Sequence, residues 1–329
     1  MGFGRVKPYP YLTEEGKLRR MRGLAERALD HYNLDVRRLT CVARQRHTTF
    51  RVETSSGYEY ALRVGARPSQ TDGDTATELA WLEALTKDPL VSAARPIRNR
   101  KRKLITSVTH EGVPEQRPCV LFDWIPGQPV GDAADTADYG MMGELAAHLH
   151  DNAEQWKPGR RRLAPLVWDR VFYYPDEPVV LYDGRFRRVM TPERTEIVKE
   201  IEERAAAELA RLHQQVPLMM LHGGLQPWKV HLHGGRLHVL DFEDVMLGAP
   251  VQDLAITLSY NRQHPEYQAL LGAFVDGYRS NRKWPVEYEG QLLLLMAARS
   301  VMLINYLLRM DVAADEYVAS AVEQMTELL

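Results

Sequence analysis

The segment MMLHGGLQPWKVHLHGGRLHVLDFED (219–244) decides how this sequence is interpreted. Its second half, VHLHGGRLHVLDF (230–242), places apolar runs on both sides of Gly234 and Gly235, which predicts a short hairpin that turns at these glycines. Asp241 follows the second run, so its carboxylate is expected to project from the end of a strand. That position suits a metal ligand, although an aspartate there could instead cap a turn.

Outward from this segment, the chain changes from strand patterns to helix patterns. Before residue 126, apolar periodicity predicts helices at 15–34 and 75–87 and strands at 42–54, 58–64, 103–109 and 117–125. After it, helices are expected at 141–156, at 196–213 and over most of 250–329. These patterns predict an α+β fold of two lobes: a small antiparallel-sheet lobe (1–125) and a larger helical lobe (126–329). The junction near 122–127 would form a natural cleft.

Composition limits the classes of partner. The chain has 329 residues, 45% of them hydrophobic, and a formal net charge of -2. A pI near 6.6 gives no overall attraction to nucleic acid or to acidic membranes. The basic segments RPIRNRKRK (95–103) and KPGRRR (157–162) are interpreted as solvated turns. We therefore expect neither nucleic acid nor membrane as a partner.

Cysteine content and terminal sequence favour the cytoplasm. Cys41 and Cys119 show no metal-binding spacing and no framework of pairs, which is typical of a reducing compartment. The N-terminal residues lack the apolar core of a secretion signal. The most apolar run, 291–308, is interrupted by Arg299 and Asn305 and is interpreted as a core helix.

Three residues match the needs of phosphoryl transfer, which depends on cations at the phosphates and on acidic ligands for magnesium. Arg63 lies in the strand YALRV, from which its side chain could reach phosphate oxygens. Glu78 lies in the following helix and could fix Arg63 by a charge-assisted, bidentate bond. Asp241 would supply the metal ligand. Taken alone, however, Arg63 on an alternating strand is more often a solvated residue.

The order of these motifs identifies a family resemblance. The segment CVLFDWIPG (119–127), then HGGLQPWKV (222–230), then VLDFEDVMLGAPVQDLA (239–255) resemble the aminoglycoside phosphotransferase and choline kinase family, whose fold is similar to that of protein kinases. The similarity runs from about residue 40 to about residue 260. The last two motifs are specific because they occur together and in order.

The resemblance implies ATP and Mg²⁺ as cofactors and assigns a role to each matching position. Arg63 would bind phosphate with Glu78 as its partner, and Asp241 would bind magnesium. His222 would support the catalytic loop, which Asp253 would brace. The adenine would be hydrogen-bonded by backbone groups of a hinge segment made of Phe122, Asp123, Trp124 and Ile125.

Two positions depart from the family pattern, which is His-Gly-Asp-Leu with an Asn five residues after the Asp. Gly224 stands in place of the catalytic base, and Lys229 stands in place of the second metal ligand. Loss of a general base predicts turnover lowered by roughly 10²- to 10⁴-fold. Lys229 could compensate by neutralising phosphate charge, and Asp244 or Glu243 could serve as a substitute acid. The alternative is a pseudokinase that binds a nucleotide or metabolite and reports to a protein partner.

Other polar and aromatic residues have open interpretations. His231, His233 and His238 suggest zinc, but no Cys or carboxylate completes a familiar spacing, so a hairpin surface is favoured. Aromatic residues could line a substrate pocket or belong to the core: Trp124, Trp168, Tyr173 and Trp228. The acceptor is expected to be a small hydroxylated molecule, which the sequence does not specify further.

Overall fold

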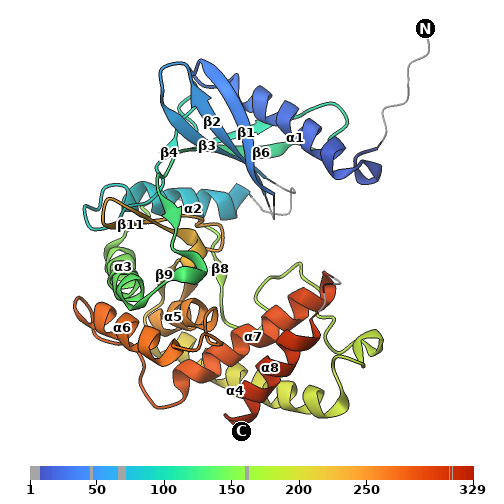
Figure 1. Cartoon of the computed structure of the whole chain (residues 1–329), viewed down its shortest axis with the longest axis vertical. Helices are drawn as coiled ribbons and strands as arrows, with labels where there is room; N and C mark the ends of the chain where they lie inside the picture. The colour runs from blue at the N-terminus through green and yellow to red at the C-terminus, as the bar shows by residue number, and fades with distance from the viewer. Residues whose placement is uncertain (1–7, 45–46, 66–71, 160–162, 311, 313) are drawn as a thin grey trace. The chain divides into compact units, whose positions relative to one another are not determined.

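The structure, a computed structural model, describes residues 8–44, 47–65, 72–159, 163–310, 312 and 314–329. Its contacts divide the chain into two compact units (Figure 1). Unit 1 consists of Met1–Lys87, Ser92–Pro126 and Pro158–Ala164. Unit 2 consists of Asp88–Val91, Gly127–Lys157 and Pro165–Leu329.

Unit 1 is built on one antiparallel sheet. Its strands are β1 (Val36–Arg44), β2 (Thr48–Thr54), β3 (Glu59–Val64), β4 (Pro96–Ile97), β5 (Ile105–Val108) and β6 (Arg117–Asp123). Their spatial order is β1-β2-β3-β6-β4, with β5 also paired to β6. Because β3 pairs with both β2 and β6, Arg63 lies on an interior strand, opposite Thr49 and Val120. An interior strand is a rigid support for a binding residue.

The strand predicted over residues 42–54 is wrong in extent. This stretch belongs to two antiparallel strands, and Cys41 of β1 pairs with Phe50 of β2. Residues 45 and 46 within the predicted strand lie outside the described residues. Both strands are rich in β-branched and apolar residues, so composition alone does not reveal where one ends. The helix predicted to reach residue 34 ends at Leu29.

The described part of unit 1 contains two α-helices. The N-terminus of α1 (Glu14–Leu29) is capped by Thr13, whose side chain accepts from the Gly16 N–H at 3.2 Å. The buried face of α1 joins the apolar side chains of the sheet in one core, including Leu24, Phe50 and Leu62. The second helix, α2 (Asp72–Leu85), carries Glu78 and buries Leu79, Leu82 and Leu85, the spacing that the sequence predicts.

Unit 2 is mostly helical, as the sequence predicts. Its helices are α3 (Thr136–Gln155), α4 (Pro192–Gln215), α5 (Pro250–Ser259), α6 (Tyr267–Arg279), α7 (Gln291–Arg309) and α8 (Asp315–Thr326). Two of them begin earlier than predicted because polar residues cap them further upstream. Asp135 and Asp138 form a capping box at α3, and the Thr191 side chain caps α4.

Short strands complete unit 2 and position the loops of the site. They are β7 (Gln128–Pro129), β8 (Leu166–Val167), β9 (Met219–Leu221), β10 (Val230–His233), β11 (Arg236–Val239) and β12 (Met246–Gly248). The predicted hairpin is confirmed, since β10 and β11 pair antiparallel around Gly234 and Gly235, which have φ of 58° and 74°. β12 pairs with β9, so the segments that precede and follow the hairpin lie side by side.

Helix α7 is the one described helix that is long and apolar enough to cross a membrane by length and composition. In the structure 61% of its apolar window is buried, and Leu295, Val301 and Ile304 are fully enclosed. This packing inside unit 2 accounts for its apolar composition.

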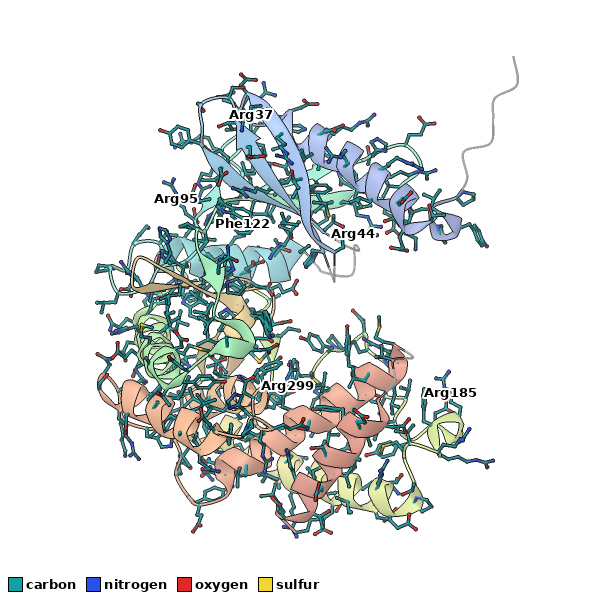
Figure 2. The ribbon with its side chains drawn as sticks, viewed as in Figure 1. Arg37, Arg44, Arg95, Phe122, Arg185 and Arg299 are labelled. Carbon is teal, nitrogen blue, oxygen red and sulfur yellow. The ribbon has the colours of Figure 1, made fainter. Side chains whose placement is uncertain are left out.

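The first basic segment forms part of the surface of unit 1. Arg95, labelled in Figure 2, pairs with Asp123, with 2.8 Å between Nε and Oδ2. Arg98 pairs with Glu83. Within the second basic segment, residues 160–162 lie outside the described residues.

Candidate active site

The loop that follows β9 is held by one buried carboxylate. The backbone N–H groups of His222 and Gly223 donate to Oδ2 and Oδ1 of Asp253, at 3.1 and 2.9 Å. Asp253 lies in α5 and is 3% exposed. A carboxylate that accepts two backbone donors fixes the direction of the chain through this loop. The loop brace that the resemblance implies is therefore present as a pair of hydrogen bonds.

A buried histidine orients the brace. His150 of α3 contacts Oδ2 of Asp253 through Nε2 at 3.2 Å and the hydroxyl of Tyr278 through Nδ1 at 2.9 Å. Burial alone would raise the pKa of Asp253, but hydrogen bonds from His150 and from the Gly223 N–H help to lower it, so the pKa lies below its usual value. Asp253 is accordingly ionised at neutral pH.

His222 links the loop to the end of the hairpin. Its Nε2–H donates to the carbonyl of Leu240 at 3.0 Å, and its ring packs on Phe242 with 4.6 Å between centroids. Burial lowers the pKa of His222, and the nearby charge of Lys229 lowers it further. His222 is therefore neutral, and its contacts support the loop.

Gly223 can only be glycine in this arrangement. Its φ is +73°, and a Cβ atom would lie 2.1 Å from the carbonyl oxygen of Asp244. The loop after β9 and the segment after β11 thus approach each other through backbone atoms. This contact brings positions 224, 241 and 244 together.

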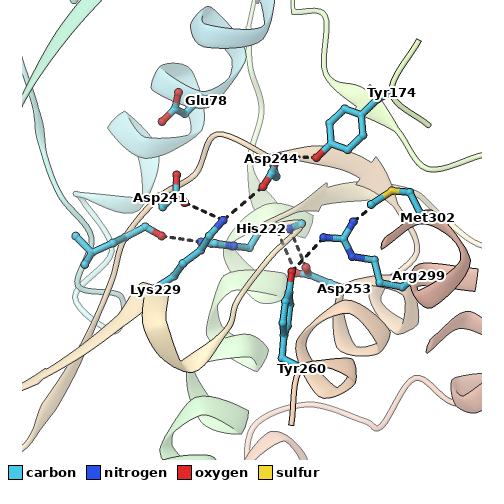
Figure 3. Close-up of polar contacts among 12 residues, drawn as sticks. Glu78, Tyr174, His222, Lys229, Asp241, Asp244, Asp253, Tyr260, Arg299 and Met302 are labelled. Atoms are coloured by element: carbon cyan, nitrogen blue, oxygen red, sulfur yellow. Dashed lines mark hydrogen bonds and ion pairs between the residues drawn. The ribbon is translucent and has the colours of Figure 1, made fainter. Parts of the chain in front are cut away.

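Lys229 lies between two carboxylates of unit 2 (Figure 3). Its Nζ is 2.8 Å from Oδ2 of Asp241 and 3.4 Å from Oδ2 of Asp244. Burial would lower the pKa of Lys229, but the carboxylates of Asp244 and Asp241 raise it well above its usual value. The side chain, 13% exposed, is thus an ammonium ion at neutral pH.

Asp241 is the most accessible member of this cluster. It is 36% exposed, against 13% for Asp244, and its φ of +60° places it in the left-handed region. Aspartate tolerates that region better than most residues.

The vacant side-chain position at Gly224 faces the same cluster. A Cβ atom there would lie 3.1 Å from Nζ of Lys229 and 3.8 Å from Oδ2 of Asp244. The hydroxyl of Tyr174 donates to the other oxygen of Asp244 at 2.7 Å. The structure therefore brings together Lys229, Asp241, Asp244 and the backbone of Gly224.

In unit 1, Arg63 and Glu78 form the predicted bidentate ion pair. Nη1 and Nη2 of Arg63 lie 2.8 and 2.5 Å from Oε1 and Oε2 of Glu78. The side chains are 12% and 2% exposed. The guanidinium also stacks over Phe122, 5.3 Å from the ring centroid. These contacts leave Arg63 little rotational freedom.

The segment predicted to hold the adenine is partly engaged within unit 1. The N–H of Asp123 donates to the carbonyl of Arg95 at 2.9 Å, and that of Trp124 donates to the carbonyl of Glu59 at 3.2 Å. The Ile125 N–H has no hydrogen-bond partner among the residues that the structure describes. Among the N–H groups of Asp123, Trp124 and Ile125, that of Ile125 is the one left for a ligand.

The other residues with open interpretations are mostly structural. His231 and His238 are cross-strand neighbours on the hairpin, and no group of three or more His, Cys, Asp or Glu with metal-binding geometry occurs among the described residues. Trp168 and Tyr173 are buried in the core, whereas Trp228 is 53% exposed.

Sequence reasoning missed the buried polar partners behind the site. His150 lies on an apolar helix face, which is the one signal that could have singled it out. Arg299 donates to the hydroxyl of Tyr173 at 2.7 Å and to that of Tyr260 at 3.1 Å, and the second contact is drawn in Figure 3. Tyr174 comes from an irregular segment without any motif, so nothing in the sequence indicated its bond to Asp244.

Comparison with known proteins adds a family and a fold. The profile described as the phosphotransferase enzyme family matches residues 41–289. A curated relative, the uncharacterized protein sll1119 of Synechocystis sp. (strain ATCC 27184 / PCC 6803 / Kazusa), is 25% identical over 242 residues. That match covers 72% of this chain and 64% of the relative.

Solved structures show the same architecture. The amicoumacin kinase hAmiN, in complex with AMP-PNP, Ca²⁺ and Ami, is similar with a TM-score of 0.75 and 16% identity, covering 96% of both chains. A microcompartment-associated aminopropanol kinase has a TM-score of 0.72 and 19% identity, covering 93% of this chain and 95% of that one. At these identities the likeness establishes the kinase-like α+β fold that the sequence predicts.

Proposed function

The chain belongs to the phosphotransferase enzyme family, and we propose that it transfers the γ-phosphoryl group of ATP to a hydroxyl of a small molecule. The observation that carries the proposal is the bidentate Arg63–Glu78 pair, because it holds a guanidinium on a rigid strand in the geometry that binds phosphate oxygens. The similar structures in complex with AMP-PNP and with ADP support ATP as the donor.

Contacts described above support each proposed role. Arg63 binds the phosphates, and the Ile125 N–H is the hinge donor for the adenine. Asp241, with 36% of its side chain exposed, would hold a magnesium ion, which would neutralise phosphate charge. Lys229 adds a positive charge beside Asp241.

We assign the proton acceptor to Asp244, because Gly224 has no side chain to serve. Oδ2 of Asp244 lies 3.8 Å from where a Cβ of residue 224 would be, so its carboxylate reaches the space of the missing base. The acceptor hydroxyl gives its proton to Asp244 while its oxygen bonds to the γ-phosphorus. The bond from that phosphorus to the β–γ bridging oxygen breaks, and ADP leaves with the electron pair.

The acceptor is proposed to be a small hydroxylated amine. The similar structures include an aminopropanol kinase and a spectinomycin phosphotransferase, the latter with a TM-score of 0.58 and 11% identity over 93% of both chains. Cytoplasmic localisation, with no nucleic acid or membrane partner, is proposed from the two free cysteines and the balanced charge.

Ligand-induced stabilisation tests the proposal. ATP at about a hundred times its Kd should raise the free energy of unfolding by about 2.7 kcal/mol, because it binds the folded chain alone. A rise in melting temperature that increases with Mg²⁺ is the expected result. The absence of any shift with millimolar ATP, ADP or GTP would refute nucleotide chemistry for this chain.

A pseudokinase is the second candidate, and the observation that favours it is the absence of a side chain at Gly224. In that case the chain binds a nucleotide or metabolite and signals its presence to a protein partner. A pseudokinase that binds a nucleotide predicts the same thermal shift with ATP. Product formation separates the two candidates, since the pseudokinase releases no ADP with any acceptor.

A further inference from the structure

Lys229 brings a positive charge to the place where kinase-like sites gather divalent cations. Its Nζ lies 2.8 Å from Oδ2 of Asp241 and 3.4 Å from Oδ2 of Asp244, with 13% of its side chain exposed. In protein kinases, two magnesium ions are held by the Asp at the equivalent strand end and by an Asn of the catalytic loop. Here the position of that Asn is the one that provides the ammonium.

The residues present suit one divalent ion better than two. Magnesium requires oxygen ligands at about 2.0–2.1 Å in octahedral geometry, and an oxygen that accepts from an ammonium is a poorer ligand. Both oxygens of Asp244 have partners, since Tyr174 donates to Oδ1 at 2.7 Å and Lys229 lies beside Oδ2. Asp241 is paired with Lys229 alone among the described residues and keeps 36% exposure.

We infer that the Lys229 ammonium is a built-in second cation, so that the nucleotide complex contains one divalent ion instead of two. The inference rests on the proposed function, because it presupposes bound ATP phosphates. The net charge at positions 224 and 229 agrees with this inference. Compared with the family pattern, Gly for Asp at 224 adds one positive unit and Lys for Asn at 229 adds another. Together they equal the charge of one magnesium ion.

The test counts bound Mn²⁺, which substitutes for Mg²⁺, from the EPR signal of the free ion while the chain is saturated with β,γ-imido-ATP. The wild type should bind one ion per chain. Lys229→Asn removes the ammonium and offers an amide oxygen, so it should bind a second. Lys199→Asn is the matched control, because Lys199 is half exposed on α4 and pairs with Glu196. It should bind one ion.

The outcomes separate this inference from the function on which it rests. Two ions on the nucleotide-bound wild type overturn the inference and leave the proposed function standing. No ion on the nucleotide-bound wild type overturns the inference and also the magnesium role proposed for Asp241. An equal count for wild type and Lys229→Asn also overturns it. If Lys229→Asn does not fold, the wild-type count still decides, and Lys229→Arg, which keeps the charge, should again bind one ion. Failure of the wild type to bind β,γ-imido-ATP at any Mn²⁺ concentration overturns both.

Discussion

Replacing Asp244 by Asn is expected to lower phosphotransfer by roughly 10²- to 10⁴-fold, the usual contribution of a general base. The amide keeps the shape of the side chain and can still accept from the Tyr174 hydroxyl, which is 2.7 Å from Oδ1 in the wild type. Asp241 still neutralises Lys229. Nucleotide affinity should therefore change little, and the loss should be in kcat.

A second substitution, Gly224→Asp, should restore activity to the Asp244→Asn variant. Gly224 is not among the residues with positive φ, and the atom nearest to an added Cβ is Nζ of Lys229, the mobile end of a long side chain, at 3.1 Å. The carboxylate oxygens of an Asp at 224 would extend about 2.4 Å beyond that Cβ by standard bond lengths. They would lie near Oδ2 of Asp244, the proposed proton acceptor, which is 3.8 Å from the Cβ position.

Electrostatics makes the effect of Gly224→Asp on activity differ between the wild type and the Asp244→Asn variant. Two carboxylates about 4 Å apart repel by about 4 kcal/mol at an effective dielectric constant near 20, and a carboxylate and an ammonium attract by a similar amount. In the wild type, Gly224→Asp therefore meets opposing forces from Asp244 and Lys229 and should change activity little. In Asp244→Asn the attraction is unopposed, and we expect at least roughly tenfold recovery of the lost activity.

The assay is ADP release at saturating ATP, with a panel of small hydroxylated amines and with water as acceptors. Asp276→Asn, an exposed substitution on α6, is the control for loss of one carboxylate. Thermal shifts with ATP verify that each variant still binds nucleotide. Full activity in Asp244→Asn would refute the assignment of the proton acceptor. A gain from Gly224→Asp that is equally large in both backgrounds would show that Asp244 is not the substitute.

Three further predictions concern the supports of the site. Arg63→Lys keeps the charge but loses the bidentate geometry, so ATP affinity should fall by roughly tenfold, measured as a smaller thermal shift; an unchanged ATP titration would contradict the role of Arg63. Gly223→Ala should lower the free energy of unfolding in urea by at least roughly 1 kcal/mol more than Gly235→Ala does, because both glycines have φ near +74° but a Cβ at 235 meets no atom within 4 Å. Equal losses would contradict the close approach at Gly223. The pKa of His222 is below its usual 6.5, so the unfolded chain binds the extra proton as pH falls through that value. His222 should then reduce stability by up to about 1.4 kcal/mol per pH unit below 6.5, and His222→Gln should show a shallower slope between pH 7.5 and 5.5.

Features of the site that depend on residues close together in the sequence could be predicted from local patterns. The glycine pair predicted the hairpin, and the positions of Arg63 on a strand and Glu78 on the next helix predicted their ion pair. The division between β1 and β2 was not predictable in this way, because both strands are rich in β-branched and apolar residues. Buried polar partners also escaped prediction, since His150 and Tyr174 reach the site through tertiary packing alone.

The structure separates the contacts that hold the loop after β9 from the side chains that are proposed to act chemically. The loop is fixed by backbone N–H groups of residues 222 and 223 on Asp253, and by the close backbone contact at Gly223. None of these contacts involves a side chain at 224 or 229. The loss of an acid at 224 and the gain of an ammonium at 229 can therefore alter the charge of the site without moving its backbone. For this reason Gly224→Asp and Lys229→Asn should report on chemistry and ion binding within an otherwise unchanged loop.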